Sequence, residues 1–554
     1  MAAVHAARPF RSLGLGLAAI LVAGCLNPAP TPAPTQVAIA PTPAPTLAPT
    51  EEPSATPGAS PLPASFPLAV VTGMTNLKSA ITVEELTSLA AKHQLVMPCG
   101  IEVTAPILAP SLTCRNGTDI AAAIQADPTL VGLLPAGLVQ PATKILPIGG
   151  VGPFGLFGAD IFGDREARAL PYPITARATD QTLPVDWLTY DPSQVWTISS
   201  VGGSCPDRGA AYQAITLRKG WDWVFNGGTA RYTGPPHLDP SPPTGISPHL
   251  VVSAVDTGHN GTVAKLVAGA DLTIADVECP IVDSEDWVPN LGRALTFSIS
   301  EDVLPLWTKK LGFDLLYMAA NHNTDKGSAG VRSSLRLLDQ YGIEHTGLGL
   351  TKDQALEPAY VTEAGIKVAF VAWNIVPGVV EADADTPGVA WLRKANVIES
   401  VRRARAAGAQ IVICDPQWWG GAEYHSDLKP AQLAELAWFD EAGCDHVIGA
   451  GTHLAGPMLL RRLAPALGGG GTFGGGVSVV MASEGNIMFG QDWWQQTQEG
   501  VIMRLAFRGG ELVNVHLDPY VMLFNSRAAL INPETDGHYV LERVFQNSTV
   551  DYTP

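Results

Sequence analysis

Basic residues are scarce in this chain of 554 residues: it has 34 Lys and Arg against 52 Asp and Glu, and charged residues make up only 16%. The formal net charge is −18. Nucleic acids and anionic lipid surfaces are bound through clustered Lys and Arg, so this balance argues against both as the main partner. With 46% apolar residues, the composition is typical of an exported acidic protein with globular cores.

Cysteine is also rare, and the seven cysteines include no CxxC or Cys/His spacing typical of a zinc site. Six of them follow residue 25: Cys99, Cys114, Cys205, Cys279, Cys414 and Cys444. An even number outside the membrane permits disulfides without revealing their pairing. Cys99–Cys114 is the favoured local pair, because both residues lie in one early segment. Cys279, Cys414 and Cys444 lie in or beside apolar segments, where core thiols and disulfides both stay open.

The N-terminus has the pattern of a secretory signal. His5, Arg8 and Arg11 precede an apolar run that ends in Leu21-Val22-Ala23-Gly24-Cys25. The LVAGC ending resembles a bacterial lipobox, which implies a lipoprotein signal peptide over residues 1–24 and lipidation of Cys25. A lipid at Cys25 would anchor an extracytoplasmic protein to the cell membrane. An ordinary signal peptide followed by a chance cysteine is the alternative.

Pro, Ala, Thr and Ser dominate residues 27–66, which cannot form a core and favour extended conformations. At roughly 3.1 Å per residue, this segment would hold the domains on the order of 100 Å from the membrane. We therefore expect residues 25–66 to be the lipidated cysteine and a linker.

Residues 67–180 predict a small α/β domain. LAVVTGMTNL indicates a strand and a turn, and Thr82 with Glu85 has the capping-box pattern of a helix start. The order ITVEEL, VGLLP, KILPIGG and YPI weakly resembles one lobe of a phosphate-type periplasmic binding protein, over residues 67–175. The Ser/Thr/Asp phosphate cradle is absent, so an accessory domain without a ligand of its own is favoured.

Apolar strands alternate with helical stretches over residues 195–525, which predicts an α/β fold. VIMRLAF and LVNVHL flank Arg508-Gly509-Gly510-Glu511 and predict a β-hairpin. This order favours two packed mixed β-sheets flanked by helices, followed by a C-terminal tail over 526–554. The glycine-rich stretch Gly468–Gly476 lacks a P-loop lysine, so a flexible loop is favoured over a phosphate site.

Polar residues follow the ends of six predicted strands. These are Gly202–Gly209, Asp276–Glu278, Asn321–Asp325, Asp415–Gly420 with Glu423–His425, Gly449–His453 and Ser483–Asn486. In α/β folds, ligands bind at the edge where such strand ends meet. Acidic, amide and imidazole groups on rigid elements suit a divalent metal. The alternative for Asn321 and Asp325 is that they only cap the helix that follows.

The order of these motifs resembles the CapA family, named for poly-γ-glutamate capsule synthesis and a branch of the calcineurin-like metallophosphoesterases. The family pattern is G-D-x4-R, N-L-E-x-P, A-N-N-H-x2-D-x-G, H-W-G-x-E-Y, G-x-H-P-H and L-G-N-F. This chain has GGSCPDRG, DVECP, AANHNTDKG, QWWGGAEY, GAGTH and EGNIMF. The resemblance spans about residues 195–520 and implies a metallophosphatase-like αββα sandwich.

The resemblance also implies roles for single residues. The metal ligands would be Glu278, Asn321, His453 and Asp207, and the catalytic residues His322 and Asp325, with His322 as acid or phosphate contact. The metal would be Mn, Fe, Zn or Mg, which polarises phosphate and activates water. Apart from the resemblance, Arg208 would supply positive charge to bind an acidic polymer. Trp418 and Trp419, beside Glu423 and Tyr424, would form an aromatic wall that grips a polymer or ring, with a packed tryptophan pair as the alternative.

Three departures from the family pattern weaken the predicted metal site. Gly203 stands where the family has an Asp, Gln417 or Trp418 where it has a His, and Gly451 where it has another His. These losses leave too few ligands for two ions, although one ion on Glu278, Asn321 and His453 stays a hypothesis. Replacement donors would have to come from nearby residues: Asp207, Asp256, His259, Asp276 or His425.

Two functions fit this sequence. The first is a cell-surface CapA-like protein for synthesis, export or anchoring of an anionic capsule or envelope polymer such as poly-γ-glutamate, with or without metal-dependent hydrolysis. Its partners would be the polymer, or an envelope glycan or peptide, and other capsule-synthesis membrane proteins. The alternative is a catalytically inactive metallophosphatase-fold module that binds a polymer or solute. Enzymatic activity stays open between them.

Overall fold

The computed structural model describes residues 62–105, 108, 112–239, 249–292, 294–463 and 476–550. The predicted signal peptide, Cys25, nearly all of the linker and most of the glycine-rich stretch lie outside these residues. Within them, no helix combines the length and the apolar character needed to span a membrane.

The first sheet is formed by residues 66–178, which fall within the small α/β domain expected over 67–180. Its strands are β1 (Phe66–Gly73), β2 (Leu95–Pro98), β3 (Ile101–Val103), β4 (Thr113–Arg115), β5 (Val131–Pro135), β6 (Thr143–Ile145) and β7 (Thr175–Ala178). The order is β3-β7-β1-β5-β2-β4, with β6 also on β1.

Four short helices accompany this sheet: α1 (Val83–Ala91), α2 (Ile120–Ala126), α3 (Arg165–Ala169) and α4 (Val185–Leu188). Thr82 and Glu85 form the predicted capping box at the start of α1. The predicted Cys99–Cys114 disulfide is also confirmed, and it links the residue after β2 to the middle residue of β4, two strands that pair in parallel.

A nine-stranded sheet begins the second part of the described chain, in the order β12-β9-β28-β27-β26-β8-β13-β16-β17. Its strands are β8 (Val195–Ser204), β9 (Gly228–Tyr232), β12 (Ala254–Asp256), β13 (Leu272–Val277), β16 (Leu315–Tyr317), β17 (Glu344–Thr346), β26 (Glu499–Arg508), β27 (Glu511–Leu523) and β28 (Arg527–Ile531). β8, β13, β16 and β17 run parallel, so their carboxyl ends meet at one edge.

A seven-stranded sheet faces it, in the order β19-β20-β22-β23-β25-β24-β29. Its strands are β19 (Ala359–Glu363), β20 (Ile366–Asn374), β22 (Ile411–Gln417), β23 (His446–Ile448), β24 (Met458–Arg462), β25 (Val477–Met481) and β29 (Thr549–Val550). Three strand pairs form outside the larger sheets: β10 (His237–Asp239) with β11 (His249–Val251), β14 (Ile281–Val282) with β15 (Ile299–Ser300), and β18 (Leu348–Gly349) with β21 (Gly388–Val389).

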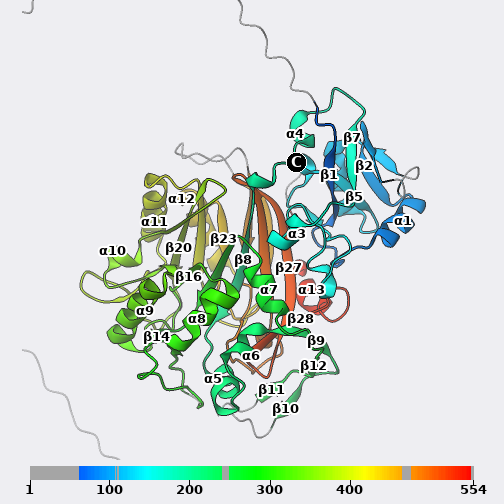
Figure 1. Ribbon diagram of the computed structural model, residues 1–554. Coiled ribbons are helices and arrows are strands. Elements are labelled where there is room, and N and C mark those ends of the chain that lie inside the picture. Colours follow the sequence, from blue (N-terminus) through cyan, green and yellow to red (C-terminus); the bar gives the residue numbers. More distant parts are fainter. Residues whose placement is uncertain are drawn as a thin grey trace, which may run out of the picture. The chain divides into compact units, whose positions relative to one another are not determined.

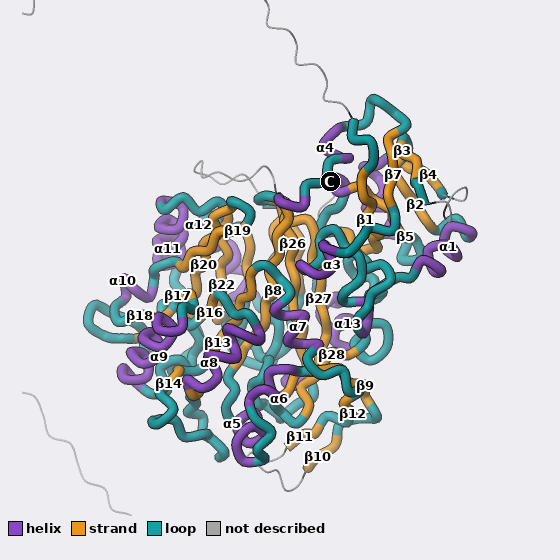
Figure 2. Tube along the Cα trace, viewed as in Figure 1, coloured by secondary structure: helices purple, strands orange, loops and turns teal. Residues whose placement is uncertain are grey.

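Helices cover the outer faces of the two larger sheets (Figure 1). They are α5 (Arg208–Ala211), α6 (Trp221–Asn226), α7 (Thr262–Ala268), α8 (Leu304–Leu306), α9 (Gly327–Tyr341), α10 (Lys352–Ala355), α11 (Lys394–Ala406) and α12 (Pro430–Ala442). The last helix, α13 (His538–Gln546), instead packs into the core between the sheets. Figure 2 shows the strands in the middle of this part and the helices around them.

Three apolar cores hold these layers together. One lies between the sheets and contains Ile274 of β13 and Phe370 of β20. The second packs α7 and α9 against the nine-stranded sheet, and the third packs α11 and α12 against the seven-stranded sheet. Helix, sheet, sheet and helix therefore follow in layers, which confirms the predicted sandwich of two mixed sheets flanked by helices.

The C-terminal residues differ from the expected tail. β28 pairs with β27 and β9 in the larger sheet, and β29 pairs with β24 in the other. Val540 and Val544 of α13 are fully buried. The burial of this apolar stripe gives residues 527–550 a structural role in both sheets. The predicted hairpin is confirmed, with β26 and β27 joined at Arg508 and Glu511.

A buried ion pair lies where the first sheet meets the second. Arg504 of β26 donates to both carboxylate oxygens of Asp518 on β27, at 2.6 and 3.2 Å. Burial alone would raise the pKa of Asp518, but Arg504 and His516 bring it below its usual range. Lys144 of β6 is 4% exposed, and burial lowers its pKa to about 8 against the attraction of Asp518. The junction thus depends on charges that water does not reach.

Asp518→Asn should destabilise the protein by about 3–5 kcal/mol, because it leaves Arg504 buried without its counter-charge. The matched control is Asp440→Asn, since Asp440 pairs with Arg461 on the surface, where such a pair contributes at most about 1 kcal/mol. Urea unfolding of both variants measures the difference. Equal losses in the two variants would contradict the importance of the buried pair.

Candidate functional site

The predicted polar motifs converge at the carboxyl ends of β8, β13, β16 and β22. Two isolated bridges extend the sheets there, Gly203 with Asn486 and Gln417 with Ala450. The loops after β23 and β25 therefore join the same edge as the ends of the parallel strands. The convergence of the motifs that was expected from the sequence is therefore present.

Glu278 fills the space that a side chain at position 203 would need. A Cβ built on Gly203 would lie 2.1 Å from Glu278 Oε1. Glu278 is 1% exposed, and burial raises its pKa to about 8, against the opposing effect of His322. A carboxyl group with such a pKa is mostly protonated at neutral pH. The predicted ligand is therefore mainly a neutral acid in the place of the missing Asp.

Asn321 has its side-chain oxygen engaged by another amide. Gln417 Nε2 donates to Asn321 Oδ1 at 3.1 Å, and both residues are buried. The structure thus resolves the uncertain register of this motif, because Gln417 is the residue that meets Asn321. One lone pair of the Asn321 oxygen is therefore taken by an amide N–H.

His453 is held at both ring nitrogens. Nδ1 lies 2.9 Å from Asn486 Oδ1, and Nε2 lies 3.3 Å from Gln491 Nε2. A neutral ring with its proton on Nδ1 satisfies both contacts. Burial lowers the pKa of His453, which favours this neutral form. Glu278 Oε1 is 3.8 Å from Nδ1, so these two predicted ligands do come together.

His322 and Asp325 form a direct pair. His322 Nδ1 is 2.9 Å from Asp325 Oδ2, and the same oxygen accepts the backbone N–H of Phe297 at 2.7 Å. The Phe297 ring meets His322 edge to face, with centroids 4.7 Å apart. The carboxylate therefore fixes the orientation of the imidazole, and does more than cap the following helix.

Asp207 and Arg208 face the surrounding loops. Asp207 accepts backbone N–H groups from Arg208, Asn290 and Ser298 at 2.9, 2.7 and 3.3 Å. Burial raises the pKa of Asp207, against these donors. Arg208 is 1% exposed and donates to the carbonyls of Gly490 and Ala294. Both side chains therefore hold the site's walls in place.

The aromatic wall differs in part from the expectation. Trp418 is fully buried and donates to the Ala482 carbonyl, whereas Trp419 is half-buried and its carbonyl meets His425. Of the two tryptophans, Trp418 is thus packed in the core and Trp419 only partly. Tyr424 instead stacks on His453 at 5.4 Å, with Trp493 and Trp494 edge-on at 6.5 and 5.3 Å.

Glu423 lies at the rim of this aromatic group. Its side chain is 30% exposed, and Oε1 is 4.0 Å from His453 Nε2. Trp494 is 47% exposed. A carboxylate beside a half-exposed indole offers a surface on which a polymer segment can stack and hydrogen-bond.

Further carboxyl groups lie deeper, between the sheets. Asp276 and Asp415 end β13 and β22, and Glu484 follows β25. Burial raises the pKa of all three, to about 8 for Glu484, and mutual repulsion adds to the effect. Ser200 donates to Glu484 at 3.0 Å. Burial and mutual repulsion thus favour the protonated form of each of these carboxyl groups.

The residues of this site do not fit the implied metal centre. No group of three or more His, Cys, Asp or Glu side chains is arranged to hold a metal ion anywhere in the described chain. Asn321 and His453 accept hydrogen bonds from Gln417 and Gln491, and Asp207 is saturated with backbone donors. Of the replacement donors, Asp256 pairs with Arg527 instead. No step of chemistry is therefore routed through a metal.

Two features of the site escaped the sequence analysis. Gln491 follows no recognisable motif, and only its contact with His453 marks it. Cys205 pairs with Cys279 and Cys414 with Cys444, so the core-thiol alternative was wrong. The sequence offered one signal for the Cys205–Cys279 pairing, because each of these cysteines lies beside a strand-end motif.

Backbone strain gathers at this site. Arg208, Tyr424, His453 and Met488 have positive φ angles of 43°, 60°, 60° and 56°, in a region that side chains other than glycine rarely adopt. Such strain persists only where the surrounding structure enforces it.

Comparison with known proteins finds a family model that matches part of this chain, including most of the strand-end motifs of the site. Residues 253–491 match the family model described as "Bacterial capsule synthesis protein PGA_cap". "Capsule biosynthesis protein CapA" of Bacillus anthracis is 23% identical over 253 residues, which cover 44% of this chain and 57% of that protein. "PGA biosynthesis protein CapA" of Bacillus subtilis (strain 168) is 25% identical over 196 residues, covering 35% and 47%. The chain spans about half the length of these curated relatives.

A calcineurin-like phosphoesterase, YfkN from Bacillus subtilis, is similar among solved structures at a TM-score of 0.27 and 11% identity. The match covers 64% of this chain and 96% of that one. The strand order, and not this likeness, defines the fold. The first sheet lies outside the matched family region, so its resemblance to a periplasmic binding protein lobe stays a prediction.

Gly203→Ala should destabilise the protein by about 1–3 kcal/mol, because the new methyl group overlaps the Glu278 carboxyl in a packed site. In the Glu278→Ala background the same substitution should cost much less, since the space is then free. Urea unfolding of the four proteins gives the coupling. Gly234→Ala is the control, because a Cβ there meets nothing within 4 Å. Equal costs in both backgrounds would contradict the steric exclusion.

Stability should fall as the pH rises from 6 to 8.5. Glu278 and Glu484 have pKa values of about 8 in the folded protein against an ordinary 4.5. Raised pKa values give stability that is complete below pH 4.5 and is lost as the pH rises through 8. Each carboxyl contributes a loss of about 2 kcal/mol over this range.

Glu484→Gln, which keeps the shape without the titration, should reduce this pH dependence of the unfolding free energy. Glu542→Gln, on the last helix, is the control, because it replaces a carboxyl outside the buried group. A pH profile unchanged by Glu484→Gln would show that Glu484 is already ionised in the folded state.

Proposed function

We propose that this protein acts in the synthesis, export or anchoring of a capsule or envelope polymer by binding the polymer, because residues 253–491 match the model of the bacterial capsule synthesis family. The resemblance implies an anionic polymer, with poly-γ-glutamate the first to test. In this proposal the domain is a binding module and not a metal-dependent hydrolase.

The observation that carries this proposal is the pairing of predicted ligand atoms with side-chain amides. Gln417 occupies the oxygen of Asn321, and Gln491 the nitrogen of His453. A metal ligand must offer a free lone pair, and a catalytic metal also needs an open coordination position. The acceptor nitrogen of His453 has no second lone pair and the oxygen of Asn321 keeps only one, so these hydrogen bonds weaken the predicted ligand set and keep the polar site neutral and ordered for binding.

The strained backbone supports a role at this place beyond folding. His453 and Tyr424 keep positive φ angles although no metal centre requires them. The same two residues form the stack that Trp494 extends toward solvent. Strain that presents an aromatic surface at the rim is consistent with recognition of a ligand.

The proposed location is outside the cytoplasm, with a lipid on Cys25 as membrane anchor and residues 25–66 as spacer. Three disulfides in the described residues support this location, because such bonds persist in oxidising compartments. A tethered binding module would hold polymer close to the membrane, where other capsule-synthesis membrane proteins would be its partners.

Hydrolysis is the second candidate, and one observation favours it. Asp325 orients His322 at 2.9 Å, an arrangement suited to general acid or base catalysis. The imidazole side chain of His322 is 19% exposed and that of Asp325 is 13% exposed, so solvent reaches both members of the pair. A metal-free reaction would rest on this pair alone.

Purified mature protein should contain only substoichiometric Mn, Fe or Zn and should cleave neither bis(p-nitrophenyl) phosphate nor poly-γ-glutamate. It should bind labelled poly-γ-glutamate saturably, as measured by fluorescence anisotropy. Metal analysis by mass spectrometry and product analysis complete the measurement. Stoichiometric metal together with turnover would establish a metal-dependent hydrolase instead. Absence of polymer binding would contradict the binding proposal.

Trp494→Ala should weaken this binding by about 1–2 kcal/mol, as loss of an aromatic anchor does at other interfaces. Ile398→Ala on α11 is the matched control, because Ile398 is also exposed, at 39%, but lies in the outer helix layer. Equal affinities of the two variants would show that the aromatic rim is not part of the binding site.

A further inference from the structure

A disulfide closes the edge at which the site is built. Cys205 follows β8 and Cys279 follows β13, and both sulfurs are fully buried. The parallel ladder between these strands ends at Val277 and Ser204, after a register shift. The covalent link therefore begins where the hydrogen bonds between the strands stop, and it keeps the two strand ends from separating.

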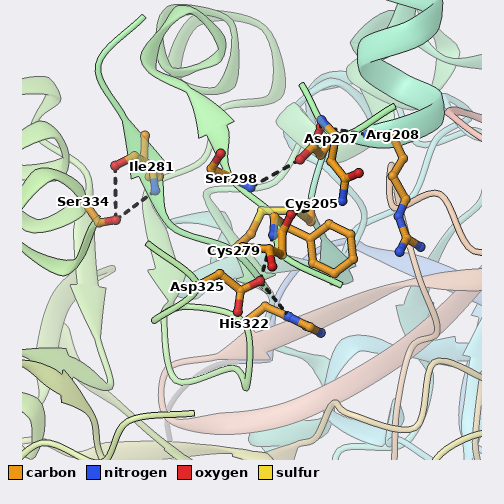
Figure 3. The surroundings of a disulfide bond; sticks show 12 residues. Cys205, Asp207, Arg208, Cys279, Ile281, Ser298, His322, Asp325 and Ser334 are labelled. Carbon is orange, nitrogen blue, oxygen red and sulfur yellow. Dashed lines mark hydrogen bonds and ion pairs between the residues drawn. A yellow bond between two sulfur atoms is a disulfide. The ribbon is translucent and has the colours of Figure 1, made fainter. Parts of the chain in front are cut away.

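Asp207 connects the disulfide-linked end of β8 to the next loop. It lies two residues beyond Cys205, and its carboxylate accepts the N–H groups of Asn290 and Ser298. These residues belong to the segment between β14 and β15, which starts just after Cys279. Figure 3 shows the disulfide with Asp207 and Ser298 around it. One carboxylate thus anchors both ends of the 290–298 stretch to the β8 side of the link.

His322 lies at the other end of this chain of contacts. Phe297, next to Ser298, donates its N–H to Asp325, which holds His322 Nδ1. The Phe297 ring also packs against the His322 ring. Figure 3 shows the His322–Asp325 pair near Cys279. An unbroken path of covalent and hydrogen bonds therefore runs from the disulfide to the imidazole.

We propose that the Cys205–Cys279 disulfide, together with Asp207, replaces a metal ion as the cross-link that holds this site in shape. A metal centre ties several strand ends together through its ligands, and the residues here do not fit one. The disulfide ties two of the same strand ends, and Asp207 extends the tie to the loop that orients His322. Cys205, Cys279 and Asp207 are positioning residues, and the site keeps its geometry without metal. This inference rests on the proposed function, because the ligand that the positioned site serves is the bound polymer.

The test compares the full mature protein with Cys205→Ala/Cys279→Ala, with Asp207→Asn, and with Cys414→Ala/Cys444→Ala. The last variant is the matched control, because it removes another buried disulfide, at 0% and 3% exposure. Two quantities are measured: the His322 imidazole NMR signal, assigned with His322→Gln, and the affinity for labelled poly-γ-glutamate. Each is measured before and after dialysis against EDTA.

Removal of the Cys205–Cys279 bond should shift the His322 signal and weaken polymer binding by about tenfold, the size of effect seen when residues supporting a site are lost. The control variant and EDTA treatment should change neither quantity. Asp207→Asn should shift the His322 signal in the same direction. This substitution keeps the disulfide, so it decides the question if the double cysteine variant does not fold.

A His322 signal that moves on EDTA treatment would overturn the inference in favour of a metal cross-link. So would a folded Cys205→Ala/Cys279→Ala or Asp207→Asn protein with an unchanged His322 signal. Wild-type protein that binds no polymer would overturn the proposed function, while the His322 signal still tests the positioning role on its own.

Discussion

Buried polar groups must find hydrogen-bond partners, and the site of this protein is organised by that requirement. The carboxyl ends of β8, β13, β16 and β22 deliver acids, amides and imidazoles into a volume that water barely reaches. An unpaired polar group there costs several kcal/mol, at about 2–7 kcal/mol each. A metal ion can satisfy such groups, and so can protons and amides. This chain uses the second solution in part: burial favours the protonated form of Glu278, and the amides of Gln417 and Gln491 pair with Asn321 and His453. Glu278 Oε2 and Gln417 Oε1 have no hydrogen-bond partner among the described residues.

The fold was predictable where the sequence has simple periodicity. Apolar runs such as Leu315–Ala320 can only be buried, and their alternation with helices leaves few arrangements. The hairpin was readable because Gly509 and Gly510 separate two apolar strands. The strands of the C-terminal residues could not be predicted, because β28 and β29 are short and are stabilised by pairing with strands far away in the sequence. Local pattern carries no information about such pairing.

The site was predictable in its location but only partly in its contacts. Parallel strands guarantee that their ends meet, which is why Glu278, Asn321 and His453 were found together. The direction of each side chain depends on the loop that follows, so Asp207 turned toward Asn290 and Ser298 instead of the centre. Gln491 lies on a loop with no motif, and the partner of Cys279 depends on how two strand ends lie in space.

The departures at Gly203, Gln417 and Gly451 are coordinated, and this coordination argues for a site that has been remodelled and not merely lost. Removing a side chain at 203 frees the space that the Glu278 carboxyl now fills. Gly451 has a φ angle of 98°, and a Cβ there would lie 2.7 Å from the Trp418 carbonyl, so a His at this position would disturb the backbone beside Gln417. Gln417 in turn pairs with Asn321. Each replacement therefore fits its neighbour, while Glu278 Oε2 and Gln417 Oε1 are buried without a hydrogen-bond partner among the described residues. A largely neutral site ordered by hydrogen bonds suits the binding of a ligand, which is the demand that the proposed function places on it.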